Sequence, residues 1–357
     1  MGKGFAITTD LDLGKMLRAG YARHLVKVEA PTNGDDENGQ KHPSNKRRRL
    51  SRLPKIRIAA ITNDTVATFA SLAYAVKAAP NSRVAMGLIV GTGTNATVPM
   101  KLEELHPFKR EDLINPGAVD TVVINTEWTI RGTDQPLEEM GIKTLWDRIL
   151  DANSDAPGFQ PFEYMTAGRY LGEIVRLVFV DLVSKDSDAH LPPSLEVKNA
   201  ILTRFLSESV ARADNATLTK ELEEKFASLS TKGFWSPARV KLIRDIAYAV
   251  QQRSSALIAA ACVGLLDCVH DIRLSTSGTL NGCAAEQHSE IEELVIAYAG
   301  GTISQYPEWL VSCQRWIDLL VAKGSASNSS KRVVLKEALD GGIIGAGVLA
   351  GMMDDIV

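Results

Sequence analysis

An amide and a carboxylate stand side by side at Asn63-Asp64, where one predicted element gives way to another. Residues 56–62 form a short β-branched run that predicts a buried strand, and residues 65–78 predict a helix. A carboxylate held rigidly at such a corner can accept the proton of a hydroxyl group while that oxygen attacks a phosphoryl group. The same two residue types are also typical of a helix N-cap with no further role. The spacing alone leaves both interpretations open.

The segment Gly91-Thr92-Gly93-Thr94-Asn95 lies between two apolar runs and predicts a strand, a turn and a second strand. Glycines let backbone N–H groups face an anion, and threonine hydroxyls add further donors. A plain hairpin turn favours the same residue types. The segment therefore predicts either a phosphate-contacting loop or a simple turn.

Two further carboxylates stand at the edges of predicted elements. Glu127 follows a predicted strand at residues 121–126, and Glu163 opens the apolar face of a helix predicted over residues 162–183. One carboxylate accepts hydrogen bonds from two adjacent hydroxyl groups, so carboxylates paired with amides are typical of a sugar site. Taken singly, Glu163 is also a favourable charge in the first turn of its helix.

The remaining apolar patterns predict the elements that position these side chains. Amphipathic spacing predicts a helix over residues 9–28, with capping candidates at residues 8–10. A long helix rich in alanine and leucine is predicted over residues 237–268, a strand over residues 291–299, and a closely packing Gly/Ala helix over residues 342–353. Strands followed by long helices predict an α/β architecture.

Together these stretches resemble the hexokinase family, which belongs to the actin-like ATPase, ribonuclease H-like superfold. The resemblance spans nearly the whole chain and is carried by five segments in family order, which are residues 61–68 (ITNDTVAT), 87–96 (GLIVGTGTNA), 124–128 (INTEW), 162–173 (FEYMTAGRYLGE) and 253–258 (RSSALI). It implies a hexokinase large domain over residues 56–357. Residues 1–55 would be a remnant of the small domain, with a basic disordered insert at residues 31–54.

The resemblance implies a role for each matching position. Asp64 matches the family's catalytic base, which takes the proton from the 6-hydroxyl of glucose or a related hexose as that oxygen attacks the γ-phosphate of ATP. The implied sugar-binding residues are Lys3, Asn63, Asn95, Glu127 and Glu163. The implied nucleotide-binding residues are Gly91, Thr92, Gly93, Gly300, Gly301, Thr302 and Gly345. ATP and Mg²⁺ are the implied cofactors, and no metal ligand is matched.

The sequence departs from the family pattern in three places. The family's first phosphate loop, Asp-Leu-Gly-Gly-Thr, and its Ser-Phe-Pro sugar segment lie N-terminal to anything present in this sequence. The family's Asp-Gly-Ser corresponds to Ala299-Gly300-Gly301, and its C-terminal Gly-Ser-Gly-x-Gly-Ala-Ala corresponds to residues 341–347, where isoleucine replaces a loop glycine. These departures predict weak nucleotide binding and little turnover. They keep a second hypothesis open, a catalytically impaired sugar-sensing protein with a regulatory protein partner.

The composition of the chain limits the partners that the protein is expected to bind and the cellular compartment in which it is expected to lie. The 357 residues suffice for two domains, and the net charge of −3 gives no general attraction to nucleic acid or to an anionic membrane. Four cysteines without CxxC spacing predict neither a zinc site nor a disulfide framework. No signal peptide is predicted, and no apolar window reaches the length of a membrane span, which predicts a cytoplasmic protein.

One charge run favours a different location. Residues 41–57 hold eight lysines and arginines and no acidic residue. Within them, Lys46-Arg47-Arg48-Arg49 resembles a nuclear localisation signal. A solvated loop tip is the alternative interpretation of the same run.

Overall fold

The computed structural model describes residues 12–24, 54–76, 81–111, 113, 119–128, 133–185, 190–228, 233–274, 292–324, 328 and 330–354. Lys3, the run from Lys46 to Arg49, and all of the predicted insert except Pro54 lie outside these residues. The chain divides into two compact units, Met1–Ile61 and Thr62–Val357.

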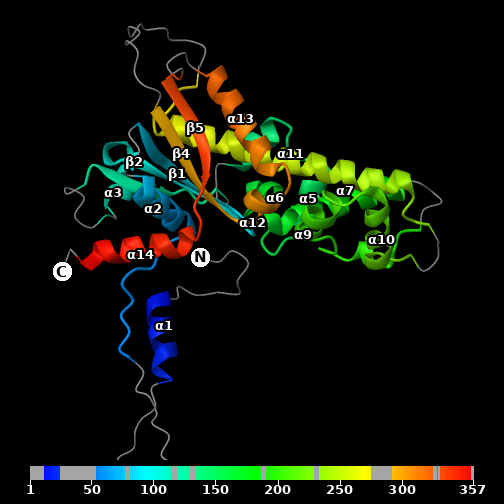
Figure 1. The fold of residues 1–357 in the computed structure, drawn as a ribbon, viewed down its shortest axis with the longest axis horizontal. Helices are drawn as coiled ribbons and strands as arrows, with labels where there is room; N and C mark the ends of the chain where they lie inside the picture. The colour runs from blue at the N-terminus through cyan, green and yellow to red at the C-terminus, as the bar shows by residue number, and fades with distance from the viewer. Residues whose placement is uncertain are drawn as a thin grey trace, which may run out of the picture. The chain divides into compact units, whose positions relative to one another are not determined.

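The second unit is built on a five-stranded mixed sheet in the order β3-β2-β1-β4-β5 (Figure 1). Its strands are β1 (Ser82–Val90), β2 (Thr94–Lys101), β3 (Thr121–Asn125), β4 (Glu292–Ala299) and β5 (Lys331–Glu337). Strand β1 is antiparallel to β2 and parallel to β4. The predicted strands within β1 to β4 are confirmed, whereas β5 was not predicted.

Helices cover both faces of this sheet (Figure 1). Helix α2 (Asp64–Val76) lies on β1 and β4, and α14 (Gly341–Asp354) packs on α2. On the other face, α11 (Pro237–Cys268) packs against α13 (Trp309–Lys323). These four helices confirm the predicted α/β architecture and the predicted helices at residues 65–78, 237–268 and 342–353.

Shorter helices connect these layers. They are η1 (Leu102–Glu104), α3 (Pro107–Glu111), α4 (Asp134–Glu139), α5 (Leu145–Ala152), α6 (Pro161–Thr166), α7 (Gly168–Ser184), α8 (Pro193–Glu196), α9 (Thr203–Phe205), η3 (Leu206–Val210), α10 (Asn215–Lys225) and α12 (Gly301–Gln305).

The prediction of one long helix over residues 162–183 is wrong, because α6 and α7 are separate helices. Ala167 between them is extended, with φ −90° and ψ 145°. The N–H of Gly168 donates to Gly91 O at 2.8 Å instead of to a carbonyl of its own helix. A tertiary hydrogen bond has thus replaced a helical one, and local spacing does not predict this.

The expectation that no segment reaches the length of a membrane span is wrong for α11. Among the described residues this 32-residue helix alone passes a test of length and composition, with a mean hydropathy of 1.2 over 18 residues. Half of that window is buried inside the protein, and Ile258, Cys262 and Leu266 are fully buried. Core helices pass the same test, so this is weak evidence for a span.

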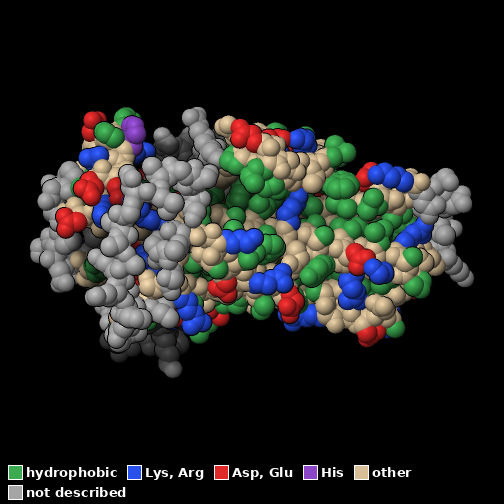
Figure 2. Space-filling view, turned by 90° about the horizontal axis from the view of Figure 1, so that it is seen from above, with side chains coloured by type: hydrophobic (Ala, Val, Ile, Leu, Met, Phe, Trp, Pro, Cys, Tyr) green, Lys and Arg blue, Asp and Glu red, His purple; other side chains and the backbone are tan. Residues whose placement is uncertain are grey.

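Charged side chains are mixed over the surface. On the part of the face in Figure 2 that is not drawn grey, lysines and arginines alternate with aspartates and glutamates. No large area of a single sign is visible there, in keeping with the net charge of −3.

The first unit contains helix α1 (Leu13–Ala22). The helix begins later than predicted and is capped by Asp12, whose Oδ1 accepts from Lys15 N at 2.9 Å. The predicted strand at residues 56–62 is wrong, because these residues are not in a sheet. A strand needs a neighbour to satisfy its backbone groups, and the described part of the first unit holds only a helix beside it.

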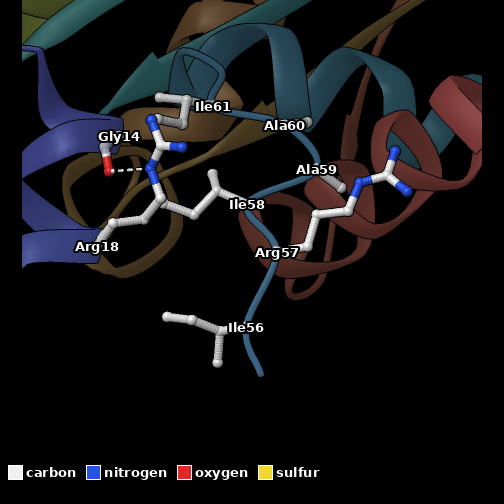
Figure 3. A pocket seen from close by; sticks show the side chains of 8 residues that line it. All are labelled: Gly14, Arg18, Ile56, Arg57, Ile58, Ala59, Ala60 and Ile61. Atoms are coloured by element: carbon white, nitrogen blue, oxygen red, sulfur yellow. Dashed lines mark hydrogen bonds between the residues drawn. The ribbon is translucent and has the colours of Figure 1, made fainter. Parts of the chain in front are cut away.

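Within this unit, residues 56–61 and α1 form an open groove (Figure 3). Gly14 and Arg18 line it from the helix, where Arg18 Nε donates to Gly14 O at 3.3 Å. Ile56 and Ile61 are 44% and 50% exposed, so this part of the chain buries little apolar surface.

Candidate functional site

Asn63 and Asp64 form the N-terminal corner of α2. The Asn63 Oδ1 atom accepts hydrogen bonds from Thr65 N at 2.9 Å and from Thr65 Oγ1 at 2.6 Å. The Asn63 carbonyl accepts from Ala67 N at 3.0 Å, so Asn63 is the N-cap of the helix. Asp64 follows as the first helical residue and is exposed. The N-cap interpretation is therefore confirmed for Asn63. The Asp64 side chain is exposed, and its Oδ1 also accepts from Thr65 N at 2.9 Å.

Gly87 allows this corner to lie directly on the sheet. A Cβ atom at Gly87 would stand 2.4 Å from Thr65 O and 2.9 Å from Phe69 Cβ. Thr65 Oγ1 then lies 2.7 Å from Thr97 Oγ1 on β2. The position of Asp64 thus depends on a glycine in the middle of β1.

A closed set of amide and carboxylate contacts joins β2 to the end of β3. Asn95 Nδ2 donates to Asn125 Oδ1 at 2.6 Å, and Asn125 Nδ2 donates to Glu127 Oε1 at 2.8 Å. Glu127 N donates back to Asn95 Oδ1 at 3.0 Å. Glu127 has φ +47°, a left-handed conformation that is unfavourable for a non-glycine residue. These hydrogen bonds hold it there, as is common at functional sites.

Glu163 brings a second carboxylate to the same strand. Its side chain is 4% exposed, and its Oε2 accepts from Thr94 N at 3.1 Å. A Cβ atom at Gly93 would lie 3.3 Å from this oxygen, so the glycine leaves room for the carboxylate. Burial, with the Glu163 charge as a second cause, raises the pKa of Tyr170 to about 12.

The turn between β1 and β2 is held from outside the hairpin. Gly91 O accepts from Gly168 N at 2.8 Å and from Thr302 Oγ1 at 3.1 Å. A Cβ atom at Gly168 would stand 2.4 Å from Thr302 Oγ1 and 2.8 Å from Gly91 O. The N-terminus of α7 therefore meets the turn at close range.

The other two backbone carbonyls of this turn, those of Thr92 and Gly93, also accept hydrogen bonds. Thr92 O accepts from Arg169 N at 3.2 Å, and Gly93 O accepts from Gly91 N at 2.9 Å. The N–H groups of Thr92 and Gly93 donate to no acceptor among the described residues. Thr92 is exposed. N–H groups that lack an acceptor within the protein, beside a helix N-terminus, are typical of an anion site. The turn interpretation is confirmed, and the geometry also suits a phosphate.

Three other positions that the resemblance links to the nucleotide have internal contacts. A Cβ atom at Gly300, which has φ +122°, would lie 2.4 Å from Val90 O. A Cβ atom at Gly345 would lie 1.8 Å from Ala67 O on α2. Thr302 supports Gly91, as described above. Packing thus accounts for these residues, whereas a Cβ atom at Gly301 would meet only the side chain of Gln305, at 4.0 Å. Their contact with a nucleotide stays a prediction.

Strand β2 links the predicted sugar residues other than Lys3, which lies outside the described residues. Through Thr94, Asn95 and Thr97 it contacts Glu163, Glu127 and the Asn63-Asp64 corner of α2. Among the described residues, no group of three or more His, Cys, Asp or Glu side chains could hold a metal ion.

Two side chains beside these carboxylates, Asn125 and Gln160, were not predicted from the sequence. Asn125 completes the contacts of Glu127, and its only signal was a polar residue closing an apolar strand. Gln160, the N-cap of α6, is 5% exposed and has a buried Nε2 with no partner among the described residues. An unpaired buried donor costs about 1–3 kcal/mol. It lies three residues before Glu163, a spacing that could have indicated it.

Comparison with known proteins places these residues in context. The profile of the hexokinase family, described as "Hexokinase", matches residues 85–352. Hexokinase-2 of Solanum tuberosum is 28% identical over 298 residues, which cover 83% of this chain and 53% of that protein. The hexokinase of Schistosoma mansoni is 37% identical over 155 residues, which cover 43% of this chain and 32% of that protein. The chain spans about half the length of the curated relatives that it matches over most of its length.

Solved structures agree with the predicted fold. The hexokinase from Schistosoma mansoni complexed with glucose has a TM-score of 0.63 and 26% identity, covering 82% of this chain and 57% of that one. A second hexokinase crystal structure, with a TM-score of 0.60 and 23% identity, shares the fold. The predicted actin-like ATPase, ribonuclease H-like architecture is confirmed.

Proposed function

Because the chain belongs to the hexokinase family, we propose that its site transfers the γ-phosphate of ATP to the 6-hydroxyl of glucose or a related hexose. One observation carries the proposal. Strand β2 joins an exposed carboxylate, Asp64, to two carboxylates that are already oriented by the protein, Glu127 and Glu163. A hexose carries adjacent hydroxyl groups, and such fixed acceptors suit them.

Asp64 is the proposed general base. As the sugar oxygen forms a bond to the γ-phosphorus, the bond from that phosphorus to the bridging oxygen of ADP breaks. The hydroxyl proton passes to the Asp64 carboxylate. The first turn of α2 holds Asp64 beside Asn63, so an approaching hydroxyl meets an acceptor and an amide together.

The nucleotide phosphates are proposed to lie at the turn between β1 and β2. The N–H groups of Thr92 and Gly93 offer donors to an anion there, and the dipole of α7 adds a favourable field, although its first N–H groups already donate to Gly91 O and Thr92 O. Arg169, the second residue of α7, contacts Thr92 through its backbone N–H, and its guanidinium pairs with Asp155 at 3.4 Å. Mg²⁺, which the family uses in general, would neutralise phosphate charge, and phosphate oxygens commonly supply many of its ligands.

A second candidate is a sugar-binding regulator that signals through a protein partner. The internal contacts of Thr302 and Gly345 favour it, because packing occupies two positions that the family resemblance assigns to the nucleotide. Sugar binding by Glu127 and Glu163 is common to both candidates.

Separate calorimetric titrations of glucose and of Mg·ATP into the chain, with a coupled assay for glucose 6-phosphate, distinguish the two. The kinase proposal predicts heat from both ligands together with product. Glucose heat without nucleotide heat or product supports the regulator. A folded chain that binds no hexose contradicts both, since both depend on the same carboxylates.

A further inference from the structure

Two buried threonines stand directly behind the Asn63-Asp64 corner. Thr65 on α2 and Thr97 on β2 are each 0% exposed, and their Oγ1 atoms lie 2.7 Å apart. Neither side chain can reach a ligand at this burial. Any effect on substrate must therefore pass through a residue that they contact.

The directions of these hydrogen bonds follow from counting protons. The Thr65 N–H lies 2.9 Å from the facing atom of the Asn63 amide and 2.9 Å from Asp64 Oδ1, so its proton is shared between two acceptors. An Nδ2 group of Asn63 at that place would set two donors against each other, which identifies the facing atom as Oδ1. Thr65 Oγ1 lies 2.6 Å from the same oxygen, and two acceptors would repel at that distance. The Thr65 hydroxyl must therefore donate to Asn63. Since that hydroxyl has one proton, Thr97 must be the donor in the pair between the threonines.

These donor and acceptor assignments fix the orientation of the Asn63 side-chain amide. Its Oδ1 receives two hydrogen bonds from Thr65, so its Nδ2 group is the end that can face a ligand. Asp64 beside it is an exposed acceptor. A hydroxyl group can accept one hydrogen bond and donate another at the same time. The corner thus offers a donor and an acceptor in a fixed order.

We propose that Thr65 is a positioning residue that locks Asn63 with its Nδ2 toward a sugar hydroxyl, and that Thr97 holds the Thr65 hydroxyl in the required direction. The assignment of the ligand rests on the proposed function. Thr97 pairs with Gly87 on β1 and Asn125 on β3, so the lock is anchored in the interior of the sheet.

The test uses Thr65→Val, which keeps the shape and removes the hydroxyl, and Thr65→Ser, which restores it. Thr68→Val is the matched control. Thr68 is a threonine on the same helix, 1% exposed, whose Oγ1 has no partner among the described residues. Glucose affinity is measured by calorimetry. Loss of one oriented hydrogen bond predicts an affinity about five- to tenfold weaker in Thr65→Val. Thr65→Ser and the control are expected to stay within about twofold of the parent.

A second readout needs no sugar. In the deuterated chain labelled with ¹⁵N-asparagine, the side-chain amide signal of Asn63 is identified by its loss in Asn63→Asp. The lock predicts that this amide is as rigid as the backbone in the parent, in Thr65→Ser and in the control, and mobile in Thr65→Val. An Asn63 amide equally rigid in folded Thr65→Val overturns the lock. A parent chain that binds no hexose but shows the predicted amide behaviour overturns the proposed function and the assigned ligand, and keeps the lock.

Discussion

The Glu163 carboxylate accepts a hydrogen bond from the backbone N–H of Thr94 at 3.1 Å, and this contact joins α6 to the first residue of β2. The carboxylate is 4% exposed, so its charge depends on oriented donors instead of water. Glu127 reaches the same strand from β3 through Asn95. Two carboxylates from separate elements are thereby fixed relative to one strand before any ligand arrives.

Replacing Glu163 by glutamine tests this arrangement. Glu163→Gln keeps the size of the side chain but removes the charge and one acceptor oxygen. Hydrogen bonds to charged groups contribute about 1.5–3 kcal/mol, so glucose affinity should fall at least tenfold. Glu223→Gln, on the exposed side of α10, is the control and should bind glucose like the parent. Equal affinities in the two variants, by calorimetry, would show that Glu163 does not contact the sugar.

Alanine variants of two glycines in α14, Gly345 and Gly347, test whether Gly345 is needed for packing. A Cβ atom at Gly345 would lie 1.8 Å from Ala67 O, whereas nothing lies within 4 Å of a Cβ atom at Gly347. Gly345→Ala should therefore lower the free energy of unfolding by about 1–3 kcal/mol. Gly347→Ala should raise it by about 0.5–1 kcal/mol, because alanine is the better helix former. Urea unfolding of both variants measures the difference. Similar changes in both would contradict the packing of α14 on α2.

The contact between the two buried threonines has an energetic consequence. Removing the hydroxyl of Thr65 leaves the Thr97 hydroxyl buried without its partner, which is costly. The double variant Thr65→Val/Thr97→Val should therefore be more stable than the sum of the single variants predicts, by about 1 kcal/mol. Urea unfolding of the parent, the two single variants and the double variant measures this double-mutant cycle. Strict additivity would indicate that the two hydroxyls do not interact.

Stability should depend on pH through Glu293. The hydrogen bond from Lys336, with a further one from Ser82, lowers the pKa of Glu293 from its ordinary value of 4.5. A folded-state pKa below the ordinary value of 4.5 adds stability that is fully present at a pH above 4.5. This stability is lost as the pH falls through the folded-state pKa. The side chain is 26% exposed, so the gain at neutral pH is modest, about 0.2–1 kcal/mol.

Urea midpoints of the parent and of Glu293→Gln check this dependence. The parent should be the more stable at pH 7, and the gap should narrow as the pH falls below 4.5 and through the lowered folded-state pKa of Glu293. A gap that persists unchanged in acid would mean that the contact with Lys336 does not depend on the charge of Glu293.

Elements with strong periodicity could be predicted from the sequence. Helix α11 has the predicted bounds, because its serine and proline start and long apolar spacing are local signals. Strand β5 (KRVVLKE) escaped prediction, since charged residues flank only a few buried ones at the sheet edge. The break at Ala167 was missed because hydrogen bonds to the distant turn at residues 91–92 decide it.

The site residues likewise divide into those that the sequence indicated and those that only the folded chain reveals. Asp64, Glu127 and Glu163 stood out by type and position, and the family resemblance supplied their roles. Asn125 and Thr65 did not stand out, because their importance lies in hydrogen bonds to partners on other residues of the folded chain. Side-chain contacts of this kind follow from the packing of α2 and β3 on β2, which spacing along the chain does not reveal.

The central claim is that Asp64 accepts the sugar proton, and the most direct test compares the parent with Asp64→Asn. Glucose 6-phosphate formation and glucose binding are measured on the same preparations, with the exposed Asp120→Asn as control. We expect low but measurable turnover in the parent and the control, a fall of at least about 100-fold in Asp64→Asn, and little change in glucose affinity. Turnover in Asp64→Asn equal to that of the parent would contradict the claim.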